Sequence, residues 1–94
     1  MPTVVQGAGG AIKVRMVKGP LTLNKQPCNG LYDSEKRVIS ILKGLPPLHR
    51  WKVYFHELVH AALMDAGLDN GLPDALHETL ADAISTSRVR EAFG

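Results

Sequence analysis

The sequence has a single cysteine, no long apolar run and no cluster of basic residues. Cys28 has no second cysteine to pair with, which excludes the disulfide framework of small secreted domains and favours a reducing, cytoplasmic compartment. No apolar stretch approaches the ~20 residues that span a bilayer, and the N-terminus lacks a signal-peptide pattern, so we expect no membrane partner. The 11 Lys and Arg residues, against 9 Asp and Glu, form no basic run, so we expect no nucleic-acid partner.

The composition is that of a small folded domain. Hydrophobic residues make up 45% of the 94 residues and charged residues 21%, close to the averages of soluble globular proteins. A chain of this length has room for one core, so we expect a single domain over residues 1–94. The segment Gly44-Leu45-Pro46-Pro47 separates a front half rich in Gly and Pro, residues 1–44, from a back half rich in Ala and Leu, residues 45–94.

The front half has the patterns of a small antiparallel sheet. Residues 12–17 alternate apolar and basic side chains with the period of a half-buried strand, and residues 21–23 are a candidate second strand. Residues 31–32 and 36–42 are rich in β-formers and flank the polar turn Asp33-Ser34-Glu35, which predicts a hairpin. We therefore expect three or four antiparallel strands, followed by helices, in an α+β fold.

The back half predicts two packed helices. The first runs over residues 48–66, with Pro47 at its first position and Gly67 as its C-terminal cap. The second begins at Pro73 and Asp74, after a turn at residues 69–71. The apolar side chains at spacings of three and four, which we expect to be buried, are Leu48, Trp51, Phe55, Leu58, Ala62 and Ala66 in the first helix and Leu76, Leu80, Ala83 and Ile84 in the second.

The first predicted helix contains the segment His56-Glu57-Leu58-Val59-His60. Two histidines four apart lie on one face of a helix, so both imidazoles can reach a single Zn²⁺. Glu57 is turned about 100° from His56, which prevents it from being a third ligand but lets it reach water bound to the metal. The segment therefore predicts two zinc ligands, His56 and His60, and one general base, Glu57.

A third protein ligand must come from elsewhere, and in a hydrolase the fourth position stays open for water. The metzincin pattern is excluded, because it requires Gly and His where this chain has Leu63 and Ala66. Glu78 and Asp82 are four apart in the second predicted helix and share a face. We expect Glu78 to bind the metal and Asp82 to orient a ligand histidine through its other ring nitrogen.

The segments His56-Glu57-Leu58-Val59-His60 and Glu78-Thr79-Leu80-Ala81-Asp82 together resemble the gluzincins, the thermolysin-like zinc metallopeptidases. At this length the chain is most similar to the minigluzincins and to small phage or prophage zinc peptidases. The resemblance implies that His56, His60 and Glu78 bind zinc, that Glu57 activates the water and that Asp82 supports the first histidine. It also implies a protein or peptide substrate that pairs its backbone with an exposed strand edge, for which we select residues 36–42.

Other side chains are candidates for completing the site. His77 is an alternative ligand, and His49, two turns before the first metal-binding histidine, either lines the cleft or lies on the surface. Tyr32 and Tyr54 either donate a phenolic proton to the oxyanion or lie at the rim of the core. Larger gluzincins carry a downstream Tyr or His for this role, whereas this chain has neither residue after Asp82.

Two other functions fit the same residues. A non-catalytic zinc module would use the metal to join its helices and would bind a partner protein on its surface. A metal-free helical hairpin would be an interaction or assembly domain, and one equivalent of zinc in the purified protein would exclude it. A homodimer also fits the sequence, because each predicted helix has an apolar stripe away from its metal face.

Overall fold

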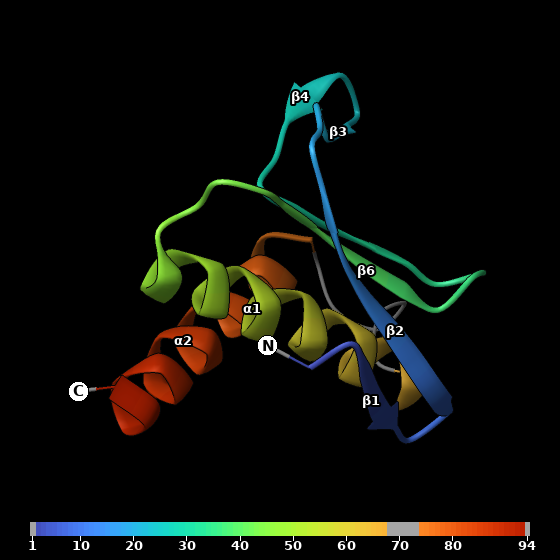
Figure 1. The fold of residues 1–94 in the computed structure, drawn as a ribbon. Coiled ribbons are helices and arrows are strands. Elements are labelled where there is room, and N and C mark those ends of the chain that lie inside the picture. The colour runs from blue at the N-terminus through green and yellow to red at the C-terminus, as the bar shows by residue number, and fades with distance from the viewer. Residues whose placement is uncertain (1, 68–73, 94) are drawn as a thin grey trace.

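The computed structural model of the chain describes residues 2–67 and 74–93, with the side chains of residue 76 and residues 78–90 in the second segment. It confirms the α+β architecture, with a sheet in the front half and two helices in the back half (Figure 1). The main sheet has the order β1-β2-β6-β5 and consists of β1 (Val4–Gly7), β2 (Gly10–Val17), β5 (Gly30–Asp33) and β6 (Val38–Leu42). A separate ribbon of β3 (Thr22–Leu23) and β4 (Gln26–Pro27) projects away from the helices. Neither described helix has the length and apolar character needed to cross a membrane.

The main sheet is mixed, so the expectation of a purely antiparallel sheet is wrong. The pairs β1 with β2 and β5 with β6 are antiparallel, and the second of these confirms the predicted hairpin. In contrast, β2 and β6 run parallel, with Val14 beside Ile39. The chain leaves β2, passes through the β3–β4 ribbon and adds β5 outside β6. Alternation along a strand reports which face is buried and carries no information on the direction of the neighbouring strand.

The edge strand beside the helices is β5. Because β6 pairs with β2 on one side and with β5 on the other, the expectation that residues 36–42 offer a free edge is wrong. Leu42 donates its backbone N–H to the carbonyl of Asn29 at 2.9 Å. Backbone groups alternate in direction along an antiparallel strand. Gly30 and Tyr32 therefore turn their N–H and C=O groups away from β6, toward the open edge.

Helix α1 (Pro47–Asp65) packs on one face of the main sheet. It begins at Pro47 as predicted. At its other end Gly67 has a φ of 74° and donates its N–H to the carbonyl of Met64 at 3.0 Å, which confirms the predicted cap. The buried core between helix and sheet consists of Ile12, Val14, Ile39, Ile41, Tyr54 and Ala61.

The buried face of α1 is rotated from the predicted stripe. Tyr54 and Ala61 are its buried residues, and Tyr54, at 4% exposure, belongs to the core and not to its rim. The sheet covers only part of the circumference of the helix, so some residues of the stripe stay in water. For the alanines this exposure costs little, because an alanine side chain has little apolar area. Of the predicted stripe, Trp51, Phe55 and Leu58 pack half-buried against the core, whereas Leu48, Ala62 and Ala66 are exposed.

Helix α2 (Asp74–Phe93) packs on α1 through small side chains. Ala81 and Ser85 are fully buried, and the Ser85 hydroxyl donates to the carbonyl of Asp82 at 3.1 Å. Small side chains let two helices approach closely. Because such side chains have low hydrophobicity, a pattern of apolar residues does not reveal the interface that they form. The predicted stripe of α2 is therefore wrong, since Leu76, Ala83 and Ile84 are exposed and Leu80 is half-buried. The predicted turn at residues 69–71 and the helix start at Pro73 lie outside the described residues.

An ion pair fastens the C-terminal end of α1 to two turns of the sheet. Nη1 and Nη2 of Arg37 donate to Oδ1 and Oδ2 of Asp65 at 2.8 and 3.0 Å. The backbone N–H of Gly9 donates to the same carboxylate at 3.0 Å, and Nη2 of Arg37 also donates to the carbonyl of Gly10 at 3.0 Å. Arg37 and Gly9 stabilise the charged carboxylate and lower the pKa of Asp65 from 3.8 to about 2. We call these four residues the Arg37–Asp65 clamp.

Candidate metal centre

The two histidines of α1 lie one turn apart on the face that meets α2. The side chains of His56 and His60 are 19% and 13% exposed, so both are largely screened from water. Their ring centroids are 4.8 Å apart, and their Nε2 atoms are 3.1 Å apart. The helical spacing of four thus places both imidazoles on one face, as predicted.

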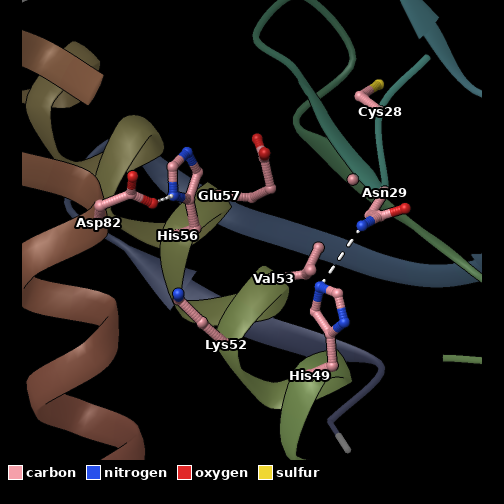
Figure 2. A pocket seen from close by; sticks show the side chains of 9 residues that line it. Cys28, Asn29, His49, Lys52, Val53, His56, Glu57 and Asp82 are labelled. Atoms are coloured by element: carbon pink, nitrogen blue, oxygen red, sulfur yellow. Dashed lines mark hydrogen bonds and ion pairs between the residues drawn. The ribbon is translucent and has the colours of Figure 1, made fainter. Parts of the chain in front are cut away.

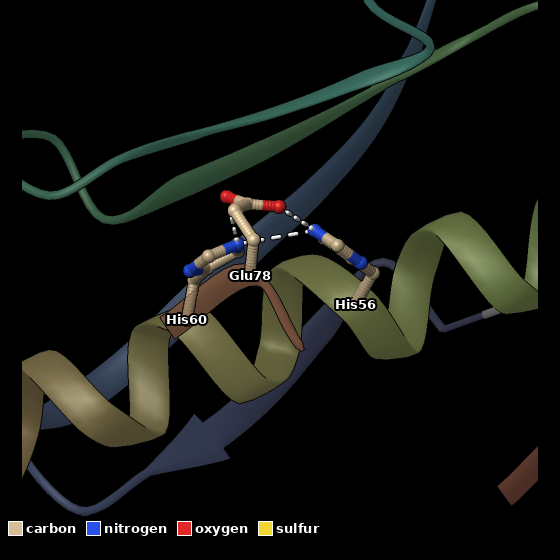
Figure 3. Close-up of side chains that lie close together, drawn as sticks. All are labelled: His56, His60 and Glu78. Carbon is tan, nitrogen blue, oxygen red and sulfur yellow. Dashed lines mark hydrogen bonds and ion pairs between the residues drawn. The ribbon is translucent and has the colours of Figure 1, made fainter. Parts of the chain in front are cut away.

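Helix α2 adds a carboxylate to this pair (Figure 3). Oε2 of Glu78 lies 3.1 Å from Nε2 of His56, and Oε1 lies 3.1 Å from Nε2 of His60. The face that turns Glu78 toward α1 is the packing face of α2, because Ala81 and Ser85 follow at spacings of three and seven. The small-residue interface therefore also positions the third side chain of the cluster.

Asp82, one turn further along α2, reaches the other side of the His56 ring. Its Oδ1 lies 3.0 Å from Nδ1 of His56. In the tautomer that carries its proton on Nδ1, the ring donates this hydrogen bond to Asp82 and leaves a lone pair on Nε2, which faces Glu78 and His60. Asp82 thus has the orienting contact that the sequence predicted.

Three electron-pair donors converge at this point. The ligand atoms of His56, His60 and Glu78 all lie within 4.8 Å of one another. A carboxylate oxygen and an imidazole lone pair repel when they face each other, whereas a shared cation attracts them all. The side chains of His56, His60 and Glu78 could therefore hold a metal ion. We call these three residues the His56–His60–Glu78 cluster.

The chain was compared with protein-family models, curated proteins and solved structures. None of them matches. The likeness to the gluzincins therefore rests on the two segments that carry it, around His56 and around Glu78.

Glu57 points away from the cluster into a neighbouring pocket (Figure 2). The pKa of Glu57 is raised from 4.5 to about 7, mainly by burial and also by the nearby charge of Glu78. His56 and a hydrogen bond from the backbone of Tyr32 lower this pKa, but burial outweighs them. The backbone contact with Tyr32 shows that the open edge of β5 faces Glu57.

The close approach of β5 to α1 requires a glycine. A Cβ atom on Gly30 would collide with Cγ1 of Val53 and lie 3.4 Å from Cγ of Glu57. Any larger residue would push the edge strand away from the helix that carries the metal ligands. Gly30 thus brings the open strand edge against the candidate site.

The pocket has a volume of about 250 Å³ and lies between α1, the segment before β5 and α2. It opens next to the cluster through His56, which belongs to both. Figure 2 shows Asp82 and Lys52 at its α2 side and Cys28 and Asn29 at the opposite side. The residues that line it are Cys28, Asn29, Gly30, His49, Lys52, Val53, His56, Glu57 and Asp82.

The other residues predicted as candidates for completing the site lie in different places. His49 lines the pocket and is also exposed, with Nε2 at 3.4 Å from Nδ2 of Asn29. Tyr54 is in the core, and Tyr32 packs against the core with its hydroxyl buried and without a partner among the described residues. Neither phenol lines the pocket. The side chain of His77 lies outside the part of the chain that the structure describes.

Sequence reasoning missed most of the pocket wall. Lys52 stands four residues before His56, so the helical period was a signal that could have found it. In contrast, Cys28, Asn29 and Gly30 reach the site only because β5 is the edge strand. Strand order depends on contacts far apart in the sequence, and no local pattern reports it.

Proposed function

We propose that the protein is a zinc-dependent metallopeptidase of the gluzincin type, with His56, His60 and Glu78 as zinc ligands. The observation that supports it is the convergence of two imidazoles and one carboxylate beside a pocket that holds a further carboxylate, Glu57. Two His and one Glu are a ligand set of catalytic zinc sites, in which a fourth position stays open. Its single cysteine favours the cytoplasm as the compartment in which it acts.

The spacing of the donor atoms fits zinc. Ligand atoms at ~2.0–2.1 Å from a tetrahedral Zn²⁺ lie about 3.3–3.4 Å from one another. The two Nε2 atoms lie 3.1 Å apart and each lies 3.1 Å from a different oxygen of Glu78, while one ligand atom from each residue falls within 4.8 Å of the others, so side-chain shifts would bring them to that geometry. A hydrogen bond donated from Nδ1 of His56 to Asp82 favours the tautomer in which Nε2 can bind a metal.

The residues have separate tasks in peptide hydrolysis. When bound, zinc polarises the scissile carbonyl and acidifies water. Glu57 accepts a proton from the attacking water and returns it to the leaving amine nitrogen, so that one water molecule is consumed and no covalent enzyme intermediate forms. The open edge of β5, with the backbone carbonyls of Gly30 and Tyr32 directed outward, is the strand on which we place an extended peptide.

A matched pair of variants tests this function. We expect the purified chain to bind one equivalent of zinc and to cleave members of a defined peptide mixture. Mass spectrometry of the peptides detects the cleavage. Glu57→Gln should keep zinc and fold but lower kcat/KM about 10²–10⁴-fold, since general-base catalysis is worth that much. Glu35→Gln, an exposed carboxylate in the β5–β6 turn, is the control and should cleave like the unmodified chain. Undiminished cleavage by Glu57→Gln would refute the mechanism.

A non-catalytic zinc module is the second candidate. The observation that favours it is that the cluster takes its ligands from both helices, so a metal would join α1 to α2. A structural site has no use for Glu57 beside an open position. One equivalent of zinc in a chain that cleaves no peptide of the mixture would support this module against the peptidase.

A further inference from the structure

The main sheet has a second face, on the side away from α1. Side chains alternate along a strand, so the neighbours of the core positions in β2, β5 and β6 point to this second face. Neither described helix covers it, because α1 packs on the core face and α2 packs on α1 (Figure 1). We call it the outer sheet face. It includes Lys13, Arg15, Val17, Leu31, Val38 and Leu42.

Strand pairing gathers the apolar side chains of the outer sheet face. Val17 pairs with Leu42 across β2 and β6, while Val38 lies on β6 and Leu31 on the adjacent β5. Neighbouring strands are about 4.7–4.9 Å apart, so these side chains are within reach of one another. All four are half-buried, so part of each remains in water. A contiguous apolar surface of this kind favours a partner that brings apolar side chains of its own.

Two cations lie beside these apolar side chains. Lys13 and Arg15 are exposed and two residues apart on β2. Nε of Arg15 donates to Oγ of the buried Ser40 at 2.9 Å, which holds the guanidinium over β6 and leaves its Nη groups for another acceptor. Among the described side chains, no carboxylate forms an ion pair with either cation. Asp33 points to the same face but accepts two backbone N–H groups of the β5–β6 turn.

The charge of the whole chain is divided in the same sense. Residues 1–44, which form the sheet, hold seven Lys and Arg against two Asp and Glu, whereas residues 45–94, which form the helices, hold four against seven. This division steers an acidic surface toward the sheet and away from the helices. The described side chains of the outer sheet face include no aromatic ring on which the bases of a single-stranded nucleic acid could stack. An acidic protein surface is therefore the better complement.

We propose that the outer sheet face binds an acidic amphipathic helix of a partner protein, whose carboxylates pair with Lys13 and Arg15 and whose apolar side chains cover the neighbouring aliphatic residues. A helix covers a sheet face as a second layer, as α1 does on the opposite face. Residues two apart on a strand are separated by about 6.6 Å, and residues four apart in a helix by about 6 Å along its axis. Two acids one helical turn apart therefore reach both cations together. The outer sheet face is separate from the cluster, so this binding does not depend on the proposed peptidase function.

Titration of the ¹⁵N-labelled full chain with model helices tests the partner class. The acidic probe is an amphipathic peptide with Leu along one face and pairs of Glu four residues apart beside it. The neutral probe has Gln in place of every Glu. We expect the acidic probe to shift the amide signals of Lys13, Arg15, Val38 and Leu42. The neutral probe should bind about 5-fold more weakly for each ion pair lost, the strong end for an exposed pair.

Single substitutions in the chain locate the contact. Lys13→Gln should weaken the acidic probe about 5-fold and leaves the hydrogen bond between Arg15 and Ser40 in place, so its effect is not one of folding. Arg15→Gln should weaken the probe to a similar extent. Lys25→Gln, an exposed lysine at the tip of the β3–β4 ribbon, is the control and should bind like the unmodified chain.

Several results would overturn the inference. They are equal binding of the two probes, shifts confined to other surfaces, no binding of the acidic probe, and unchanged affinity in both Lys13→Gln and Arg15→Gln. A short DNA duplex or phosphatidylglycerol vesicles that bind the same residues more tightly than the acidic probe would replace the helix with a different partner. Shifts of the same signals as the concentration of the free chain rises would show instead that a second copy covers this face.

Discussion

In the Arg37–Asp65 clamp each guanidinium nitrogen donates to an oxygen, whereas in the His56–His60–Glu78 cluster the atoms that face one another are imidazole nitrogens and carboxylate oxygens, all of which can donate an electron pair to a metal. Both groups join α1 to other elements with contacts of about 3 Å. The clamp is complete with protein groups alone, because its positive and negative charges match. The cluster holds one carboxylate and two imidazoles, so a proton on a ring or an added cation supplies its positive charge. Polar contacts of similar length thus differ in their roles: those of the clamp stabilise the fold, whereas those of the cluster provide atoms that can bind a cation.

The largest expected effect is on the cluster. His60→Ala should weaken zinc binding by more than the ~10–100-fold that loss of an outer hydrogen-bond partner costs, because it removes a ligand. Zinc at 100 times its Kd should add about 2.7 kcal/mol to the free energy of unfolding of the unmodified chain, and none to that of the variant. Thermal unfolding with zinc and with a chelator measures both.

The clamp supplies the control for this experiment. Arg37→Gln leaves Asp65 without its charged partner and should lower the unfolding temperature equally with and without zinc, while the zinc-dependent increase persists. Stoichiometric zinc in His60→Ala would contradict the assignment of that ligand. Loss of the zinc response in Arg37→Gln would show that the two groups are coupled and would remove the contrast between them.

A smaller effect is expected from the residue that orients the ligand. Asp82→Ala removes the acceptor of the His56 Nδ1–H and should lower zinc affinity ~10–100-fold without abolishing stoichiometric binding. Competition with a chromophoric chelator measures the affinity. Glu35→Ala is the matched loss of an exposed carboxylate and should leave the affinity unchanged. Equal affinities of the Asp82→Ala variant and the unmodified chain would show that Asp82 does not support the metal site.

The smallest effect concerns the pH dependence of the clamp. The pKa of Asp65 is lowered to about 2, so its charged form stabilises the fold above the unfolded value of 3.8. This contribution should be complete near neutral pH and should fall as the pH drops from 3.8 toward 2. Denaturant midpoints between pH 6 and pH 2, measured with a chelator present, should show this fall, and Asp65→Asn should reduce it. An unchanged pH profile in Asp65→Asn would contradict the assignment.

The parts of the molecule that depend on neighbours in sequence were predictable. The helical spacing of His56 and His60, the Pro47 start and the Gly67 end are properties of one helix, and the structure has them. The hairpin of β5 and β6 follows from one polar turn and two flanking strands. Contacts of this kind need no knowledge of the rest of the fold.

The parts that depend on distant segments were not predictable. The direction of β2 relative to β6 and the edge position of β5 follow from the path of the whole front half. The packing face of α2 was predicted wrongly, because the buried Ala81 and Ser85 have low hydrophobicity, whereas the exposed Leu76 and Ile84 are strongly hydrophobic. Glu78 and Asp82 were found through their spacing of four in the second predicted helix, without knowledge of what that face packs against.

The small-residue interface of α2 also affects how quickly a bound ion can leave. Within the described residues α2 meets chiefly α1, and side chains as short as Ala81 and Ser85 bury little apolar area. An ion held by the cluster would lose its contact with Glu78 whenever this helix lifts from its neighbour. Ion exchange would then be coupled to helix undocking, and the dissociation rate of the ion would follow the lifetime of the contact between the two helices.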